Sequence, residues 1–252
     1  GMMCTTARTS ALEVGTPSVA VTAAAISPNN SIIAAYSSHL VNLDTRQRLK
    51  VFKHQAVHAL YVSNSSLLVC GGRSVCIVDL SRDTKMSVSS PERRLKDWII
   101  SAMWISDSVI AVLFSYNSVE ILDASLASSF SVQCDSCCII YGGCLVVEEN
   151  VLVCCSGTVF NKPLLWKPLE QSKVIRSYEG HSGVIFDVKL TKSQLFSVSD
   201  DRTLIIWDRL SGSLQHKLYG HTARVLKVVL MPWCEGVVSV GCLLYTSPSP
   251  RD

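Results

Sequence analysis

The sequence predicts an all-β fold assembled from short strands that recur in a regular order. Hydrophobic residues make up 48% of the 252 positions and charged residues 17%, which is enough apolar material for a sizeable core. The apolar residues fall in short runs rich in valine, isoleucine and leucine, and turn residues separate these runs. Similar run endings also return at nearly regular intervals. We therefore expect repeated β units and no long helices.

The recurring ending is a large apolar residue followed by a polar one at the close of a β-rich run. Five such pairs occur, at steps of 35, 44, 44 and 41 residues: Leu43-Asp44, Val78-Asp79, Leu122-Asp123, Trp166-Lys167 and Trp207-Asp208. Spacings of this size are typical of repeat proteins, in which each unit buries its apolar face by stacking on its neighbours. The pattern predicts five complete units. Ala223 to Leu230 and Gly236 to Val240 then predict two strands of a sixth.

The best-preserved unit runs from Gly180 to His221. It opens on a Gly-His pair, passes Ser199-Asp200-Asp201, reaches Trp207-Asp208 and arrives at a second Gly-His pair. These residues resemble one blade of the WD-repeat β-propeller family, whose period is about 40 to 45 residues. The resemblance implies an all-β propeller with about five complete four-stranded blades and part of a sixth.

The resemblance also implies a structural tetrad inside this blade. Its members would be joined by hydrogen bonds, from imidazole to carboxylate with a hydroxyl and an indole N–H in line: His181, Ser199, Asp201 and Trp207. A partly buried carboxylate is costly unless donors satisfy it, which gives a physical reason for these residue types to occur together.

Two upstream segments carry basic residues. Arg46, Arg48, Lys50 and Lys53 alternate along the expected fourth strand of the first unit, where charge protects an outer edge. The tail of the second unit, Ser81 to Lys96, is polar and contains a proline, so we expect a long surface loop.

The end of the chain departs from the repeat. We expect residues 1–241 to form an incomplete WD-repeat propeller, whereas Cys242 to Asp252, CLLYTSPSPRD, offers no third strand. These eleven residues look like a translated sequencing adapter, which predicts a non-native tail; a natural Pro-Ser tail is the alternative. The chain has no apolar run of membrane-spanning length. We expect a soluble, cytoplasmic protein.

Details between the blade motifs indicate a narrower resemblance. Asp97-Trp98-Ile99, Trp104, GHSGVIF, SDDRTLIIW and YGHTARVLKV, within Lys96 to Leu230, are similar to the N-terminal propeller of a WD-repeat family of tRNA 2'-O-methyltransferase partner subunits. The resemblance implies a non-catalytic scaffold or regulator, whose partner adds a 2'-O-methyl group to the ribose at the wobble position. It implies no cofactor and no contact with DNA or membrane. It also implies that the chain contacts tRNA as part of the complex with the methyltransferase.

Two other functions stay open. A generic WD-repeat scaffold could serve a ubiquitin ligase receptor or a trafficking complex, and a propeller hydrolase is a third reading. The sequence has no G-x-S-x-G, no Gly-rich phosphate loop and no H-E-x-x-H. The expectation is therefore a binding module and not an enzyme.

Five basic residues in expected loops are candidates for RNA or partner contacts: Arg93, Arg94, Lys96, Arg202 and Arg224. The net charge of +3 permits RNA binding without requiring it, and no interleaving of aromatic and basic residues is visible along the sequence.

Cysteines gather in the fourth unit. Cys134 and Cys137 form a C-x-x-C with Cys138 and Cys144 nearby, but a second ligand pair for zinc is missing. We expect reduced, buried thiols and no metal site.

Overall fold

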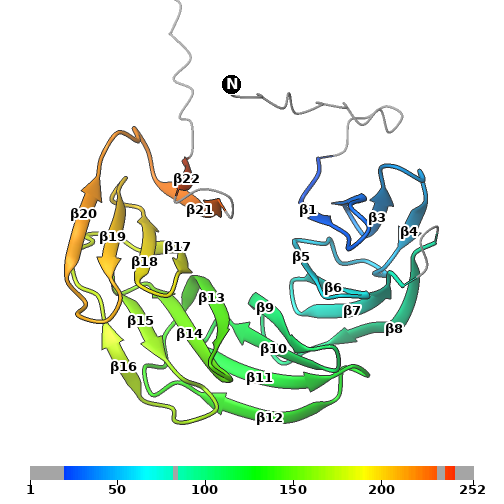
Figure 1. Cartoon of the computed structure of the whole chain (residues 1–252), viewed down its shortest axis with the longest axis horizontal. Coiled ribbons are helices and arrows are strands. Elements are labelled where there is room, and N and C mark those ends of the chain that lie inside the picture. Colours follow the sequence, from blue (N-terminus) through cyan, green and yellow to red (C-terminus); the bar gives the residue numbers. More distant parts are fainter. Residues whose placement is uncertain (1–19, 82–84, 232–235, 242–252) are drawn as a thin grey trace, which may run out of the picture.

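The computed structural model describes residues 20–81, 85–231 and 236–241, and every regular element within them is a β-strand. Five four-stranded antiparallel sheets and one two-stranded sheet follow one another along the chain. Figure 1 shows the sheets side by side in an arc, with the first strand of each innermost and the fourth at the outer rim. The all-β repeat predicted from the sequence is confirmed. No helix long and apolar enough to cross a membrane occurs among the described residues.

Each sheet is a meander of consecutive strands. The first contains β1 (Ala23–Ile26), β2 (Ile32–Tyr36), β3 (His39–Asn42) and β4 (Arg48–Lys50). The second contains β5 (Ala59–Val62), β6 (Ser66–Gly71), β7 (Ser74–Asp79) and β8 (Ser87–Arg94). The third contains β9 (Ile99–Ser106), β10 (Val109–Phe114), β11 (Ser118–Asp123) and β12 (Ser128–Gln133).

The remaining sheets continue the same order. The fourth contains β13 (Ile140–Glu148), β14 (Val151–Thr158), β15 (Pro163–Trp166) and β16 (Val174–Ser177). The fifth contains β17 (Ile185–Leu190), β18 (Gln194–Ser199), β19 (Leu204–Asp208) and β20 (Leu214–Leu218). The sixth contains β21 (Val225–Met231) and β22 (Gly236–Gly241), close to the two strands predicted for it. The predicted tail, Cys242 to Asp252, lies outside the described residues.

The core is a series of apolar layers between neighbouring sheets. Along β6, Leu67 and Val69 belong to the layer shared with the first sheet, whereas Leu68 and Cys70 belong to the layer shared with the third. This alternation follows the two-residue period of a strand that is buried on both faces. Each inner sheet is therefore stabilised by both of its neighbours, as in other stacked repeats.

The prediction of a loop from Ser81 to Lys96 is wrong, because Ser87–Arg94, half of the segment, forms β8. This strand pairs with β7, and Val75 faces Arg93 while Ile77 faces Ser90. Pro91 lies in the register shift between these pairs, on an outer strand where a missing N–H removes no necessary ladder bond. A proline that reads as a loop signal in sequence is thus accommodated in an edge strand.

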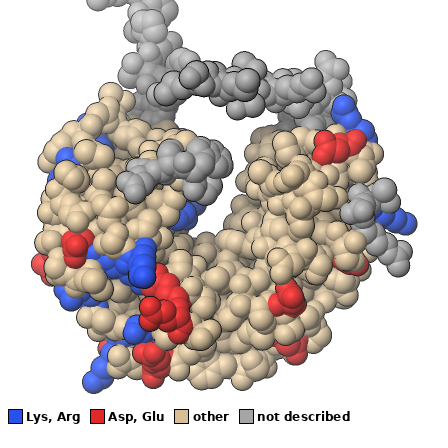
Figure 2. Space-filling model, viewed as in Figure 1, with Lys and Arg blue, Asp and Glu red and all other residues tan. Residues whose placement is uncertain are grey.

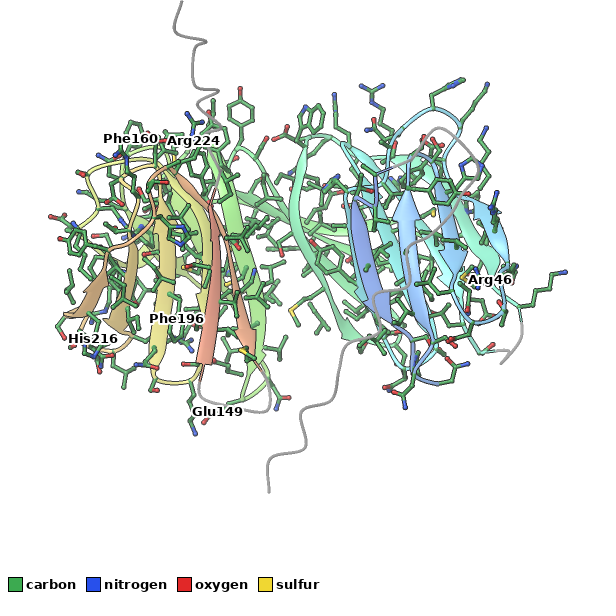
Figure 3. All side chains as sticks on the ribbon, turned by 90° about the horizontal axis from the view of Figure 1, so that it is seen from above. Arg46, Glu149, Phe160, Phe196, His216 and Arg224 are labelled. Atoms are coloured by element: carbon green, nitrogen blue, oxygen red, sulfur yellow. The ribbon has the colours of Figure 1, made fainter. Side chains whose placement is uncertain are left out.

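One face of the arc collects two kinds of connection. In a four-stranded meander, the turn between strands two and three and the loop to the next sheet lie at the same end of the strands. We call this end the loop face. Figure 3 shows Phe160 of the β14–β15 turn and Arg224 of the β20–β21 loop along it, and Glu149 of the β13–β14 turn at the opposite face.

Candidate functional site

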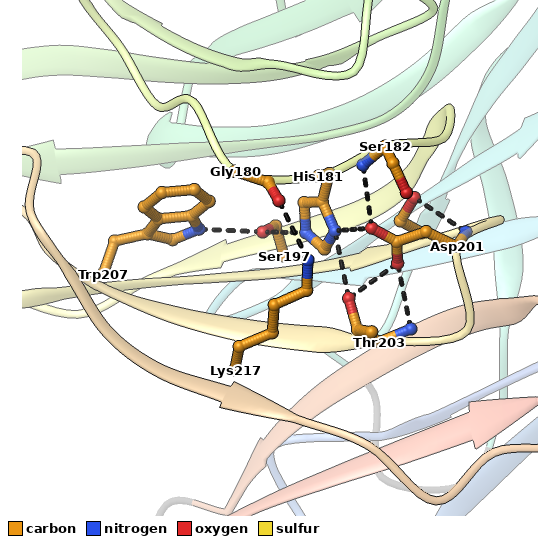
Figure 4. A network of polar contacts seen from close by, with 9 residues as sticks. Gly180, His181, Ser182, Ser197, Asp201, Thr203, Trp207 and Lys217 are labelled. Atoms are coloured by element: carbon orange, nitrogen blue, oxygen red, sulfur yellow. Dashed lines mark hydrogen bonds and ion pairs between the residues drawn. The ribbon is translucent and has the colours of Figure 1, made fainter.

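A buried polar network runs through the fifth sheet and joins its opening histidine to its third strand. The imidazole Nδ1 of His181 donates to Asp201 Oδ2 at 2.8 Å, since a carboxylate oxygen can only accept. The imidazole Nε2 lies 2.7 Å from Ser197 Oγ, and Trp207 Nε1 donates to the same hydroxyl oxygen at 2.8 Å. Figure 4 shows the chain of contacts. His181, Asp201 and Trp207 thus belong to one network.

The serine of the network is Ser197, so the assignment of Ser199 to the tetrad is wrong. Ser197 lies two residues beyond Leu195, the cross-strand partner of Trp207, on the same side of β18, which brings its hydroxyl to the indole nitrogen. Ser199 lies at the end of β18, and its hydroxyl accepts a hydrogen bond from Asp201 N at 3.2 Å. Ser199 therefore shapes the turn that carries Asp201.

The charges of the network suit a structural role. Burial lowers the pKa of His181 below its ordinary value, and the hydrogen bond with Asp201 opposes this shift only in part. Burial acts to raise the pKa of Asp201, but hydrogen bonds from Thr203 and His181 outweigh it, and that pKa is lowered. A neutral imidazole beside an ionised carboxylate results. Both side chains are almost fully buried, so the pair is placed to stabilise the blade and not to meet a substrate.

Related networks occur in the two neighbouring sheets. In the fourth sheet, Trp166 Nε1 donates to Ser156 Oγ at 3.2 Å, and this hydroxyl donates to Asn117 Oδ1 at 2.5 Å. In the sixth, His221 Nε2 lies 2.8 Å from Ser239 Oγ. The serine precedes its tryptophan by ten residues in both the fourth and the fifth sheet. That spacing is the sequence signal that would have identified the correct serine.

Two of the five candidate contact residues make contacts between neighbouring sheets. Arg93, on β8, donates from its guanidinium to the carbonyl oxygen of Leu126 in the third sheet. The Nζ of Lys96 donates to Ser131 Oγ at 2.6 Å and lies 5.2 Å from the centroid of the Phe114 ring. Both side chains therefore join the second unit to the third.

The other three candidates lie in two separate places along the arc. Arg202 is exposed in the β18–β19 turn with a positive φ of 70°, and Arg224 lies in the β20–β21 loop with its Nε 3.5 Å from Asp200 Oδ1. Arg94 ends β8, three sheets away from that turn. The five residues do not form one patch.

Arg94 instead lines a cavity of about 550 Å³ on the loop face. The cavity lies among the second sheet and the loops on either side of it, and its walls are formed by Lys53, His54, Gln55, Arg73, Ser74, Glu92, Arg94 and Trp98. Lys53 belongs to the β4–β5 loop, so its assignment to the outer strand of the first sheet is wrong. Sequence reasoning missed this cavity because its residues come from three separate connections and from the strands β7 and β8.

Exposed aromatic side chains gather on the same loop face. Five have more than half of their surface exposed: Trp98, Tyr116, Tyr141, Phe160 and Tyr219. All five lie in loops or turns of this face or at the start of a strand that leaves it. Aromatic and basic residues that do not alternate in sequence thus share one face of the arc, and Trp98 lines the same cavity as Arg94.

An ion pair lies on the opposite face. Arg209 Nη1 and Nη2 donate to Glu148 Oε1 and Oε2 at 2.5 and 2.6 Å, linking the fifth sheet to the fourth. The hydrogen bond from Arg209 lowers the pKa of Glu148. Figure 2, which views this face, shows acidic and basic side chains together over these two sheets.

Three of the four cysteines of this cluster are buried, as the sequence predicts, but Cys137 is exposed, so the expectation of a buried thiol is wrong for that residue. Cys134, Cys138 and Cys144 are buried, and the thiols in the described residues are free. Burial raises the pKa of Cys134 to about 11, so its thiolate is disfavoured. No group of three or more potential metal ligands occurs in the part of the chain that the structure describes.

These features define a class of protein, the WD-repeat β-propeller. The WD40 β-propeller domain of Doa1 matches with a TM-score of 0.70 at 14% sequence identity, covering 87% of this chain and 74% of that chain. The match shows the fold alone. No family model matches the chain.

Sequence comparison identifies relatives that resemble the chain more specifically. The chain is 32% identical over 154 residues to the tRNA (34-2'-O)-methyltransferase regulator WDR6 of Bos taurus. The Mus musculus protein of that name is 32% identical and the Homo sapiens protein 30% identical over the same length. The match covers 54% of this chain and 14% of each relative, so the chain spans a small part of their length. The chain is a WD-repeat propeller that resembles WDR6.

Proposed function

We propose that the chain is a non-catalytic scaffold that acts as partner and regulator of a tRNA wobble-position 2'-O-ribose methyltransferase. The similarity to WDR6 carries this proposal, because those relatives are named as regulators of that reaction. In this role the partner enzyme transfers the methyl group to the ribose hydroxyl. The chain holds enzyme and tRNA together, which raises their effective concentration and orients the target ribose.

The distribution of polar groups supports a scaffold. The histidine and carboxylate of the fifth sheet are committed to a buried network, whereas the loop face presents aromatic and basic side chains to solvent. Large exposed aromatic residues beside arginine are typical of surfaces that bind partners. A cytoplasmic location and the absence of catalysis by the chain itself are part of the proposal.

Affinity purification of the tagged protein tests the proposal. We expect a tRNA 2'-O-methyltransferase to be recovered with it, and depletion of the protein to reduce 2'-O-methylation at the wobble ribose. Intact wobble methylation after depletion would show that the function lies elsewhere. The purified protein alone is expected to leave tRNA unmethylated, which separates a regulator from an enzyme.

A further inference from the structure

Trp98 differs from the other tryptophans described in the structure. Trp104, Trp166 and Trp207 each donate their indole N–H to an oxygen of the protein. Trp98 is 58% exposed and lies in the β8–β9 loop, at the wall of the cavity that Arg94 lines. A large indole face in contact with solvent, next to a cavity, is available to a ligand.

Positive charge surrounds this indole. Lys53, Arg73 and Arg94 line the cavity, with Glu92 as the one carboxylate among its lining residues. Glu92 is already held, because its Oε2 accepts from Lys53 N at 2.8 Å and its Oε1 from Ser74 Oγ at 2.9 Å. The cavity therefore has a surplus of cations over anions, which favours an anionic ligand.

Contacts with the backbone fix one of these cations, Arg73, in place. A side chain at Gly71 would come within 2.3 Å of the Ala56 carbonyl oxygen, so the β6–β7 turn lies directly against the β4–β5 loop. Gly72 has a φ of 58°, which favours glycine. The guanidinium of Arg73 then donates to the carbonyl oxygens of Leu95 and Lys96, at the base of the Trp98 loop. The cavity is thus preorganised by contacts among three connections.

A second aromatic residue stands next to Trp98. Ser115 N donates to the Trp98 carbonyl oxygen at 2.9 Å, and Asp97 Oδ2 accepts from Tyr116 N at 3.2 Å. Tyr116 is 53% exposed. The two rings therefore lie on adjoining connections of the loop face, so that an extended ligand could pass from one to the other.

We propose that this cavity binds single-stranded RNA, with an unpaired base stacked on Trp98 and the neighbouring phosphates on Arg94, Arg73 and Lys53. Aromatic faces beside cations are the usual means of holding unpaired nucleotides, because every base has a stacking face and every nucleotide a charge. Paired bases in a duplex cannot reach the indole in this way. The choice of RNA rests on the proposed function, whereas the need for a flat anionic ligand rests on the cavity.

The test is a binding titration of the purified chain with a labelled RNA hairpin that has an unpaired loop. Trp98→Ala is expected to weaken binding about tenfold, the effect of losing one stacked base. The salt dependence of the affinity should be the same in Trp98→Ala as in the unaltered chain. Arg94→Gln should instead lower the slope of log affinity against log salt by about 0.7, as expected for one lost phosphate contact to a single strand.

Three controls make the result decisive. Phe130→Ala removes an exposed ring on the outer strand β12 and should leave binding unchanged. Trp98→Phe keeps a stacking face and should retain most of the affinity. A fully paired RNA duplex of the same length should bind more weakly than the hairpin. Thermal melting of each variant shows that it is folded.

Several outcomes would overturn the proposal. Unchanged affinity in Trp98→Ala excludes stacking on this ring, and equal binding of the duplex excludes selection of unpaired bases. Displacement of the hairpin by polyglutamate at equal charge would identify a site for acidic peptides. Recovery of the methyltransferase by the Trp98→Ala protein is measured in parallel, so failure of this site and failure of the proposed function remain distinguishable.

Discussion

Ser197 lies between the two nitrogens of the buried network, His181 Nε2 and Trp207 Nε1. Removing its hydroxyl leaves both nitrogens unpaired inside the fifth sheet. We expect Ser197→Ala to lower the free energy of unfolding by about 1 to 3 kcal/mol, the usual cost of stranding buried polar groups. Urea denaturation measures this difference.

Ser199→Ala is the matched control at the same scale. It removes a hydroxyl that accepts one turn hydrogen bond and touches neither nitrogen. Its effect should be smaller than that of Ser197→Ala. An equal or larger loss in Ser199→Ala would contradict the placement of Ser197 at the centre of the network.

His181 gives the blade a defined response to pH. Its folded pKa is below the ordinary value of 6.5, so the unfolded chain binds more protons when the pH falls through that value. The stability contributed by the neutral imidazole is fully present above pH 6.5. It is lost progressively as the pH falls from 6.5 through the lowered pKa of the folded protein. We expect the free energy of unfolding to decrease between neutral and mildly acidic pH, and to decrease less in His181→Gln. The same pH dependence in both proteins would contradict this account.

At the scale of the elements, the ion pair of Arg209 and Glu148 ties the β19–β20 turn to the end of β13. Arg209 is 7% exposed, so loss of its partner leaves a nearly buried guanidinium with less compensation. We expect Glu148→Gln to lower the free energy of unfolding by about 1.5 to 3 kcal/mol, the range for hydrogen bonds to charged groups. Glu149→Gln, at the exposed neighbouring position, should change it by less than about 0.5 kcal/mol. Equal effects would show that the pair does not join the sheets.

The elements also show what sequence reasoning can reach. Strand runs and turns are local, so the five units and the two strands of the sixth could be predicted from the apolar runs and the recurring endings, whereas four strands in each unit followed from the family resemblance. The strand β8 was missed because a local proline signal outweighed its pairing with β7, which no local pattern contains. The correct serine was missed because the contact of Ser197 depends on how far the indole of Trp207 reaches along the sheet.

At the scale of the whole molecule, the arc brings together residues that the sequence keeps apart. Lys53, Arg73 and Trp98 come from three connections of the loop face, and they meet Arg94, the last residue of β8, at one cavity. The sequence supplied Arg94 as a candidate but could not supply its neighbours, since the order of loops around a propeller depends on stacking of sheets. Arg202 and Arg224 lie on another part of the arc, so they are candidates for separate contacts.

The measurement that tests the central claim most directly is 2'-O-methylation of the wobble ribose by the purified methyltransferase, with and without this chain. We expect the chain to increase the methylation rate, and Trp98→Ala to reduce that increase while the Phe130→Ala protein acts like the unaltered chain. A rate that is the same with and without the chain would contradict its proposed role as a scaffold for this reaction.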